Sequence, residues 1–327
     1  MPLLLAESDV RSLLDTRARM EWIDLMERTL ADFSAGRVRQ PVRTALRMPE
    51  HDSLFAVMPG VLAGASAAGL KVVSLAPRNA ALGKPTHLAT VLLLDPATGA
   101  LLALMDGRLI TERRTAAVSA AAARALARKD AATLALLGSG VQAASHLEAF
   151  REVFALADVR VWSATAGHRD AFANREGAGV PVRACADAEQ AVRGADLVVT
   201  ATSAREPVLR GEWLEPGCHV TSVGACVADW RELDGAAVAR ARVFVDSLEA
   251  ARVEAGDLIG AQRDGLWSFE EAAGEIGAVF AGTLPGRTSP EQVTLFKSLG
   301  LACEDVASGA WLLARARERG VGRDVAL

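Results

Sequence analysis

Apolar residues in the first third of the chain change from a helical to a strand-like spacing. A helix is predicted over residues 16–35, because apolar residues recur there three and four positions apart on one face. They are Trp22, Met26, Leu30 and Phe33. After residue 39 the pattern becomes short runs rich in valine and leucine, broken by Pro, Gly, Asp and Asn, which predict strands. The predicted strands cover residues 54–58, 70–75, 87–94 and 100–105, and together they form a sheet.

The pattern changes again after residue 114. Alanine is nearly continuous from 115 to 127, which favours a helix, and the domain boundary is predicted at its start. Strands and helices then alternate, which predicts parallel strands joined by right-handed crossovers. The predicted elements are strands at 133–137, 159–162, 197–200, 219–223, 243–246 and 293–297, with a helix at 141–155 after the first of them.

A final helix is predicted over residues 300–319 and is expected to return to the first domain. The predicted fold class is therefore α/β. Residues 114–299 form a Rossmann-type, doubly wound parallel sheet, and residues 1–113, completed by 300–327, form a mixed α+β domain for substrate binding and dimerisation.

Composition excludes several classes of protein. The net charge of the 327 residues is −4, without a dense basic block, so no nucleic-acid partner is expected. Four cysteines without a C-x-x-C pair suggest neither a disulfide framework nor a metal site, and they favour the cytoplasm. No apolar stretch is long enough to predict a membrane span. The chain contains no tyrosine, which excludes the Tyr-x-x-x-Lys pair of a short-chain dehydrogenase.

A glycine-rich turn follows the strand predicted at 133–137 and opens the helix predicted at 141–155. Gly138 permits a tight turn, Gly140 lets the backbone approach a pyrophosphate, and Ala143 allows close helix–strand contact. Unpaired N–H groups at the start of the helix would face the phosphates. This context predicts a nicotinamide dinucleotide site, whose first residues are Gly138, Ser139, Gly140, Val141 and Gln142.

The end of the next strand bears on the choice of coenzyme. A carboxylate there would accept from the ribose hydroxyls of NAD, but the chain has Ser163 and Thr165, followed by Arg169. This neutral-to-basic edge favours NADP over NAD, although a solvated start of a helix would look similar. Thr200, Ala201 and Thr202 follow a strand and are expected near the nicotinamide ribose, or else form a plain turn. Val223, Ser298 and Gly300 complete the predicted coenzyme-binding set.

Several segments together resemble one known family. They are Gln40 to Thr44, Gly69 to Val73, Pro85 to Thr90, Ile110 to Ala117, Gly138 to Phe150, Asp229 to Asp234, and Phe296 to Gly300. The chain is similar in these segments to the ornithine cyclodeaminase and mu-crystallin family. The resemblance implies a homodimer in which Arg43, Lys71 and Arg114 hold the carboxylate of an amino or imino acid beside the nicotinamide.

The residue types suit that role. A guanidinium presents a planar fork to a carboxylate. Lys71 is flanked by Leu70 and Val72 in a strand, where burial would depress the pKa of its amine, so it is the candidate general acid. Thr86 and His87 are placed near the site without a catalytic role.

The reaction is predicted from residues 226–234, where the branches of this family differ. In the cyclodeaminase branch an aspartate assists, whereas this chain has Cys226 at that place, and a thiol is mostly protonated at neutral pH. Residues 229–234 instead resemble the mu-crystallin and imine-reductase branch. The expected function is therefore NAD(P)H-dependent reduction of cyclic ketimines such as Δ1-pyrroline-2-carboxylate. Ornithine cyclodeaminase, alanine dehydrogenase and a non-catalytic NADPH-dependent binding protein remain as alternatives.

Overall fold

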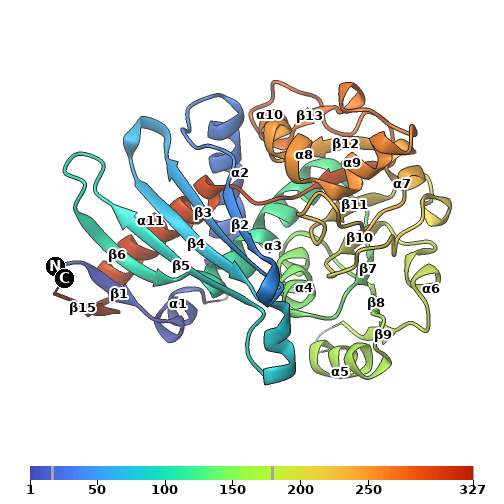
Figure 1. The fold of residues 1–327 in the computed structure, drawn as a ribbon. Coiled ribbons are helices and arrows are strands. Elements are labelled where there is room, and N and C mark those ends of the chain that lie inside the picture. The colour runs from blue at the N-terminus through green and yellow to red at the C-terminus, as the bar shows by residue number, and fades with distance from the viewer. Residues whose placement is uncertain (16–17, 178–179, 327) are drawn as a thin grey trace. The chain divides into compact units, whose positions relative to one another are not determined.

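The computed structural model describes residues 1–15, 18–177 and 180–326. The first two residues of the helix predicted from residue 16 therefore lie outside the described part. The chain divides into two compact units (Figure 1). Unit 1 comprises Met1–Arg114 and Gly300–Leu327, and unit 2 comprises Thr115–Leu299.

Unit 1 contains a mixed sheet with the strand order β15-β1-β6-β5-β4-β3-β2. The pairs β2–β3, β3–β4, β4–β5 and β5–β6 are antiparallel. Strand β1 is parallel to β6, and β15 is antiparallel to β1. Its strands are β1 (Leu3–Leu5), β2 (Thr44–Met48), β3 (Ser53–Val61), β4 (Ala68–Leu75), β5 (His87–Leu94), β6 (Leu101–Asp106) and β15 (Arg323–Asp324). Its α-helices are α1 (Glu7–Leu13), α2 (Ala18–Ser34), α11 (Ala302–Arg319) and the first part of α3 (Gly107–Leu126).

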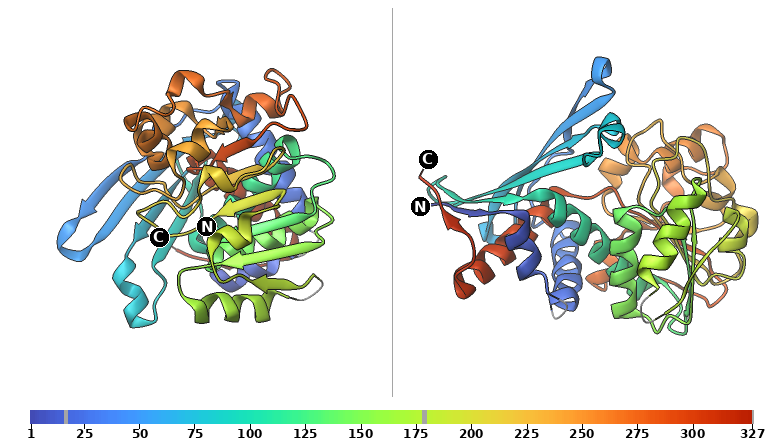
Figure 2. Two further views of the ribbon diagram at one scale, coloured as in Figure 1. Left: turned by 90° about the vertical axis from the view of Figure 1, so that its right-hand side faces the viewer. Right: turned by 90° about the horizontal axis from the view of Figure 1, so that it is seen from below.

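One face of this sheet is covered by helices. Figure 2 shows α2 and α11 on the same side, and α11 packs across β3, β4 and β5. Side chains on a strand alternate between faces, so residues paired across strands share a face. One such row, directed into the core, contains Met58, Lys71, Val91 and Met105, all buried.

The close approach of α11 to the sheet depends on a small residue. A Cβ at Gly309 would lie 3.3 Å from the side chains of Val91 and Leu93 on β5. The helix ends at Gly320, whose φ of +64° is the left-handed conformation typical of a helix C-terminus. This helix packs on the sheet of unit 1.

Unit 2 contains a sheet of parallel strands in the order β13-β12-β14-β11-β10-β7-β8-β9. Read from β9, its first five strands follow the 3-2-1-4-5 order of a doubly wound fold, whose strand order reverses between β7 and β10. Strands β7 (Thr133–Leu137), β10 (Leu197–Thr200) and β11 (His219–Ser222) are almost wholly buried, as expected when both faces are covered.

The remaining elements of unit 2 surround these strands. They are α4 (Val141–Val153), β8 (Asp158–Trp162), α5 (Ala166–Glu176), β9 (Val182–Ala184), α6 (Ala188–Val192), α7 (Gly235–Ala239), β12 (Arg242–Val245), α8 (Leu248–Glu254), α9 (Gly256–Arg263), β13 (Gly274–Glu275), α10 (Ile276–Phe280) and β14 (Thr294–Lys297). Short 3-10 turns in the two units are Pro49–His51, Ala63–Ala65, Pro77–Leu82, Gly211–Trp213 and Phe269–Glu271.

The predicted α/β fold class is confirmed, with two differences in detail. The alanine-rich helix begins at Gly107 and not near residue 115, because the Asp106 carboxylate accepts from Leu109 N (2.9 Å) at the helix start. The alanine run covers only the later part of α3, and the division between the units, between Arg114 and Thr115, falls inside this helix. Strand β14 lies between β11 and β12 in the sheet, an insertion that the chain order of the strands does not reveal.

No helix within the described ranges combines the length and apolarity needed to cross a lipid bilayer.

The turn after β7 yields a stability prediction. Gly138 has a φ of +121°, and a Cβ there would collide with the carbonyl of Ala201. We expect Gly138→Ala to lower the free energy of unfolding by about 2 kcal/mol or more, measured by urea denaturation followed by circular dichroism. Gly140→Ala is the control, because a Cβ at Gly140 would meet no atom within 4 Å, and it should cost about 1 kcal/mol or less. Equal losses in the two variants would contradict this account of the turn.

Candidate active site

Lys71 is a lysine inside the core of unit 1. It lies on β4, pairs with Met58 and Val91 across the sheet, and is only 2% exposed. Its Nζ forms an ion pair with Asp305 Oδ2 at 2.7 Å. A charged amine this deep needs such a partner, because an isolated buried charge is strongly unfavourable.

Arg114 shares the same carboxylate. Its Nε donates to Asp305 Oδ1 (3.1 Å), and its Nη1 donates to Glu304 Oε2 (2.6 Å). Arg114 lies on α3, whereas Glu304 and Asp305 lie in the first turn of α11. Two carboxylates from one helix turn therefore hold cations that come from a strand and from another helix.

The segment directly before α11 contacts two cations at Gly300. Gly300 has a φ of +82°, and a Cβ there would collide with the guanidinium of Arg114. Arg43 Nη2 donates to the carbonyl of Gly300 (3.2 Å), and Gln40 Oε1 accepts from Cys303 N (2.8 Å). The structure thus brings Arg43, Lys71 and Arg114 together at the start of α11, and Gly300, predicted to bind coenzyme, belongs to this cluster of unit 1.

Several charged side chains meet at this place. They are the cations Arg43, Lys71 and Arg114 and the carboxylates Glu304 and Asp305. Burial and the positive charge of Arg114 lower the pKa of Lys71 to about 8, although Asp305 opposes the shift. Desolvation acts to raise the pKa of Asp305, but Arg114 and Lys71 together lower it below its usual value. The named groups therefore form a cationic site with one amine that can exchange a proton near neutral pH.

His87, at the start of β5, is expected near this site from the sequence. Burial first, and then the charges of Lys71 and Arg114, lower its pKa to about 4, so the ring is neutral at pH 7. A neutral imidazole adds no charge to the cluster.

In unit 2 the predicted dinucleotide residues gather at the carboxyl ends of β7 and β8. Gly138 N donates to Trp162 O (2.8 Å), and the hydroxyls of Ser139 and Ser163 are 3.0 Å apart. Gly140 precedes α4 directly, and Val141 is 58% exposed at the first position of that helix. Gln142 lies in the first turn of α4 and its carbonyl contacts His146 Nδ1 (2.7 Å).

The end of β8 carries the residues predicted to choose between coenzymes. Ser163 Oγ donates to Thr165 O (3.2 Å), and Arg169 Nη1 donates to Ser163 O (3.5 Å) and Ala186 O (3.3 Å). Thr165 is exposed, and Arg169 is partly exposed. This edge presents hydroxyls and a guanidinium to solvent.

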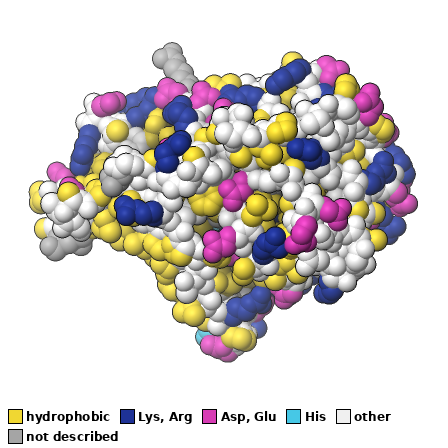
Figure 3. Space-filling model, turned by 90° about the horizontal axis from the view of Figure 1, so that it is seen from above, with side chains coloured by type: hydrophobic (Ala, Val, Ile, Leu, Met, Phe, Trp, Pro, Cys, Tyr) yellow, Lys and Arg dark blue, Asp and Glu magenta, His cyan; other side chains and the backbone are white. Residues whose placement is uncertain are grey.

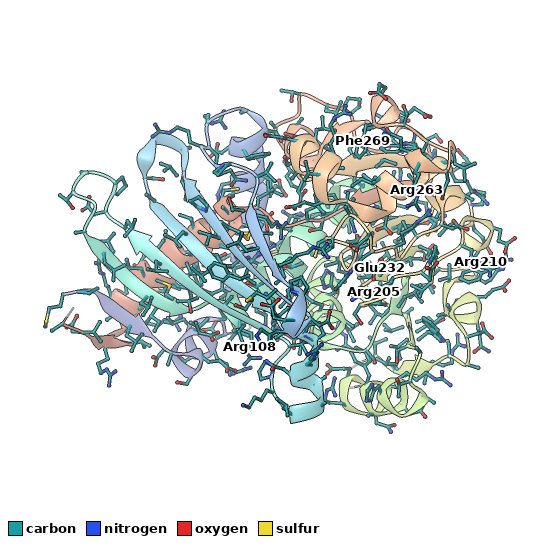
Figure 4. All side chains as sticks on the ribbon, viewed as in Figure 1. Arg108, Arg205, Arg210, Glu232, Arg263 and Phe269 are labelled. Carbon is teal, nitrogen blue, oxygen red and sulfur yellow. The ribbon has the colours of Figure 1, made fainter. Side chains whose placement is uncertain are left out.

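The loops after β10 and β11 are tied to a buried glutamate. Glu232 accepts from Thr202 N (2.6 Å) and Thr202 Oγ1 (2.8 Å) at Oε1, and from Thr200 Oγ1 (2.9 Å) and Gly224 N (2.7 Å) at Oε2. Burial raises the pKa of Glu232, and Lys297 opposes that shift. Figure 4 labels Glu232 within unit 2. The hydroxyls of Thr200 and Thr202 thus bind Glu232.

A second buried carboxylate holds the segment that carries Glu232. Asp257 Oδ1 accepts from the backbone N of Glu232 (2.7 Å) and Leu233 (2.9 Å), and Oδ2 forms an ion pair with Lys297 Nζ (2.9 Å). Ser222 Oγ donates to the same Oδ2 (2.8 Å). All these side chains are buried at the carboxyl ends of β11 and β14.

Three further predicted positions lie at these strand ends. Val223 N donates to Thr200 O (2.9 Å), Ser298 N donates to Ser222 O (2.9 Å), and Ala201 N donates to Leu137 O (2.8 Å). Cys226 is partly exposed in the loop after β11, and its N donates to Gly224 O (3.0 Å).

The sequence analysis missed the carboxylates of both clusters. Glu304 and Asp305 look like acidic residues in the first turn of a helix, which are common there for electrostatic reasons alone. Glu232, Asp257 and Lys297 are separated along the chain, and only their burial distinguishes them from surface charges. Lys297 carried one weak signal, because it directly follows the apolar residues Leu295 and Phe296 in a predicted strand.

Together these features define the class of the protein as a Rossmann-type α/β protein with a second, mixed α+β unit. Comparison with known proteins identifies the family. A model of the ornithine cyclodeaminase/mu-crystallin family matches residues 2–320, and the chain belongs to that family.

Individual relatives are similar over nearly their whole length. The ketimine reductase mu-crystallin of Mus musculus is 41% identical over 310 residues, which are 94% of this chain and 95% of the relative. The structure of Thermococcus litoralis Δ1-pyrroline-2-carboxylate reductase in complex with NADH and L-proline has a TM-score of 0.95 and 37% identity, covering 99% of this chain and 100% of that one. An archaeal alanine dehydrogenase dimer with bound NAD has a TM-score of 0.93 and 33% identity, covering 100% and 99%.

Proposed function

We propose that this protein reduces small cyclic imino acids, such as Δ1-pyrroline-2-carboxylate, with a reduced nicotinamide coenzyme. The observation that carries the proposal is the cluster of Arg43, Lys71 and Arg114 at the start of α11, in which the buried amine of Lys71 has a pKa of about 8. The names of the mouse and Thermococcus relatives support the same reaction.

The residues of unit 2 fit a dinucleotide. A Cβ at Gly140 would meet no protein atom, so packing does not explain the glycine, whereas close approach of a pyrophosphate does. The N-terminus of α4 would offer its N–H groups to the phosphates. We therefore assign Gly138 to Gln142 to the pyrophosphate, and Thr200 to Thr202, Val223 and Ser298 to the nicotinamide half. When bound, the reduced nicotinamide supplies a hydride.

The cationic cluster of unit 1 supplies the rest of the chemistry. The guanidinium groups of Arg43 and Arg114 hold the substrate carboxylate and orient the C=N bond, with hydrogen bonds to charged groups contributing about 1.5 to 3 kcal/mol each. The hydride adds to the imine carbon, and the imine nitrogen takes a proton, from Lys71 or from solvent. The product is the cyclic amino acid, and Lys71 regains its proton from water.

The substrate assay tests this function. We expect oxidation of reduced coenzyme, followed at 340 nm, with Δ1-pyrroline-2-carboxylate or Δ1-piperideine-2-carboxylate. Since Lys71 must be protonated to act as the acid, kcat/KM for reduction should fall about tenfold per pH unit above about pH 8. Lys71→Met should lower kcat by about 10² to 10⁴, whereas Lys84→Met, at an exposed lysine of unit 1, should leave it unchanged.

The alternatives predict different outcomes of the same assay. Conversion of ornithine to proline without net use of coenzyme would reverse the assignment in favour of a cyclodeaminase. Turnover of pyruvate with ammonia would indicate the alanine dehydrogenase reaction, which the archaeal structure makes the second candidate. Coenzyme and ligand binding without turnover would indicate a binding protein.

For the coenzyme we propose a preference for NADP over NAD. The support is the end of β8, where Ser163, Thr165 and Arg169 offer hydroxyls and a guanidinium in place of a carboxylate. We expect NADPH to bind at least tenfold more tightly than NADH in calorimetric titrations, and Arg169→Ala to remove most of that difference. Arg175→Ala, on the same helix, is the control. Equal affinities in the wild type would contradict the preference.

The opposite face of the unit 1 sheet supports a homodimer. The row paired across β3 to β6 on that face contains Pro59, Leu70, Leu92 and Leu104, all partly or fully exposed. Hydrophobic side chains are plainly visible at the surface in Figure 3. Because apolar patches of this kind mark interfaces, we propose that two copies pair through this face. The four cysteines, whose spacing suggests no disulfide framework, fit the reducing cytoplasm, where we place the protein.

Light scattering after gel filtration tests the dimer. We expect a mass of twice the 34.3 kDa of the chain, and Leu92→Asp should yield monomers because it places a charge within the apolar face. Val253→Asp, at an exposed site in unit 2, should leave the mass unchanged. A monomeric wild type would contradict the proposed interface.

A further inference from the structure

The carboxylate of Glu232 joins two loops that are distant in sequence. It accepts from Thr200, the last residue of β10, from Thr202 in the loop that follows, and from Gly224 after β11. Three of these four hydrogen bonds come from the two loops, and the fourth comes from the end of β10. Gly224 has room for no side chain, because a Cβ there would lie 2.5 Å from Glu232 Oε1. Both carboxylate oxygens of Glu232 accept hydrogen bonds, so this one side chain holds both loops.

The position of Glu232 is itself fixed. Its backbone N and that of Leu233 donate to Asp257, which is paired with Lys297 on β14. Glu232 O also accepts from Val208 N (2.8 Å) and Leu209 N (2.9 Å). The carboxylate is 0% exposed, so water cannot replace a lost donor without rearrangement. The arrangement therefore defines one geometry for the two loops.

These loops lie on one side of the point where the strand order of the sheet reverses. In a doubly wound sheet each half binds one mononucleotide, and the half formed by β10, β11 and β14 is opposite to the half with the glycine turn and β8. We infer that Glu232 is a positioning residue that holds the loops after β10 and β11 in the conformation that receives the nicotinamide mononucleotide half. The inference rests on the proposed function.

The test separates the two halves of the coenzyme. In Glu232→Gln one acceptor oxygen becomes an NH₂ group that faces N–H donors, so the loops must shift. We expect the Kd of NADPH to rise about tenfold, whereas the Kd of 2′-phospho-ADP-ribose, which lacks the nicotinamide, changes less than twofold. Both are measured by calorimetry on the full-length protein.

A milder variant covers the case in which Glu232→Gln does not fold. Thr200→Val removes one donor to Glu232 from a fully buried residue and keeps the side-chain volume. Thr200→Val should raise the Kd of NADPH about threefold and should leave the Kd of 2′-phospho-ADP-ribose unchanged.

The matched control is Asp234→Asn, two residues further along the same segment. Asp234 Oδ1 accepts from Ala237 N (2.8 Å) and Gly211 N (3.0 Å) and so caps α7. Asp234→Asn should lower the melting temperature of the protein. It should leave the ratio of the Kd of NADPH to that of 2′-phospho-ADP-ribose unchanged.

The outcomes distinguish this inference from the proposed function. Suppose that the wild type binds NADPH. If Glu232→Gln then raises the dissociation constants of NADPH and 2′-phospho-ADP-ribose equally, or changes neither, the positioning role is wrong and the proposed function stands. If Glu232→Gln does not fold and Thr200→Val leaves NADPH binding unchanged, the role is also wrong. A wild type that binds neither NADPH nor NADH overturns both.

Discussion

The carboxylate of Asp305 is shared by two cations that the surrounding fold buries, and Glu304 binds one of them, Arg114, as well. Asp305 contacts Lys71 on β4 and Arg114 on α3, and neither cation has an exposed fraction large enough for water to replace that contact. Removing one partner from a buried ion pair typically costs about 3 to 5 kcal/mol, because the remaining charge is left uncompensated. The start of α11 carries this carboxylate, and Gly300 just before it lies against the guanidinium of Arg114. Burial and Arg114 depress the pKa of Lys71, and Asp305 limits that shift.

The two clusters use buried carboxylates in opposite ways. In unit 1 Glu304 and Asp305 bind charged side chains, those of Lys71 and Arg114. In unit 2 Glu232 is surrounded chiefly by neutral backbone and hydroxyl donors, and it organises loops without presenting charge at the surface. The first arrangement suits substrate recognition, and the second suits the precise placement of a backbone segment.

Much of the fold follows from local patterns in the sequence. Strands β3 to β6 alternate or form apolar runs of sufficient length, and the glycines at 138 and 140 follow a buried strand directly, so these elements could be predicted. Strands β1, β2 and β15 could not, because they are short or exposed and are defined by pairing with distant segments. The basic residues of the candidate site were found by family resemblance, whereas Asp305 and Glu232 become distinctive only when packing buries them.

The division of unit 1 into two stretches of chain has a consequence for biosynthesis. During translation the residues of unit 2 leave the ribosome before α11 does, so unit 2 can fold while the sheet of unit 1 still lacks the helix that covers its core. Until then Lys71 and Arg114 have no Asp305, and the apolar face that includes Met58 and Val91 is open to solvent. Nascent chains at this stage therefore expose apolar surface that the complete protein buries, and such surface favours aggregation.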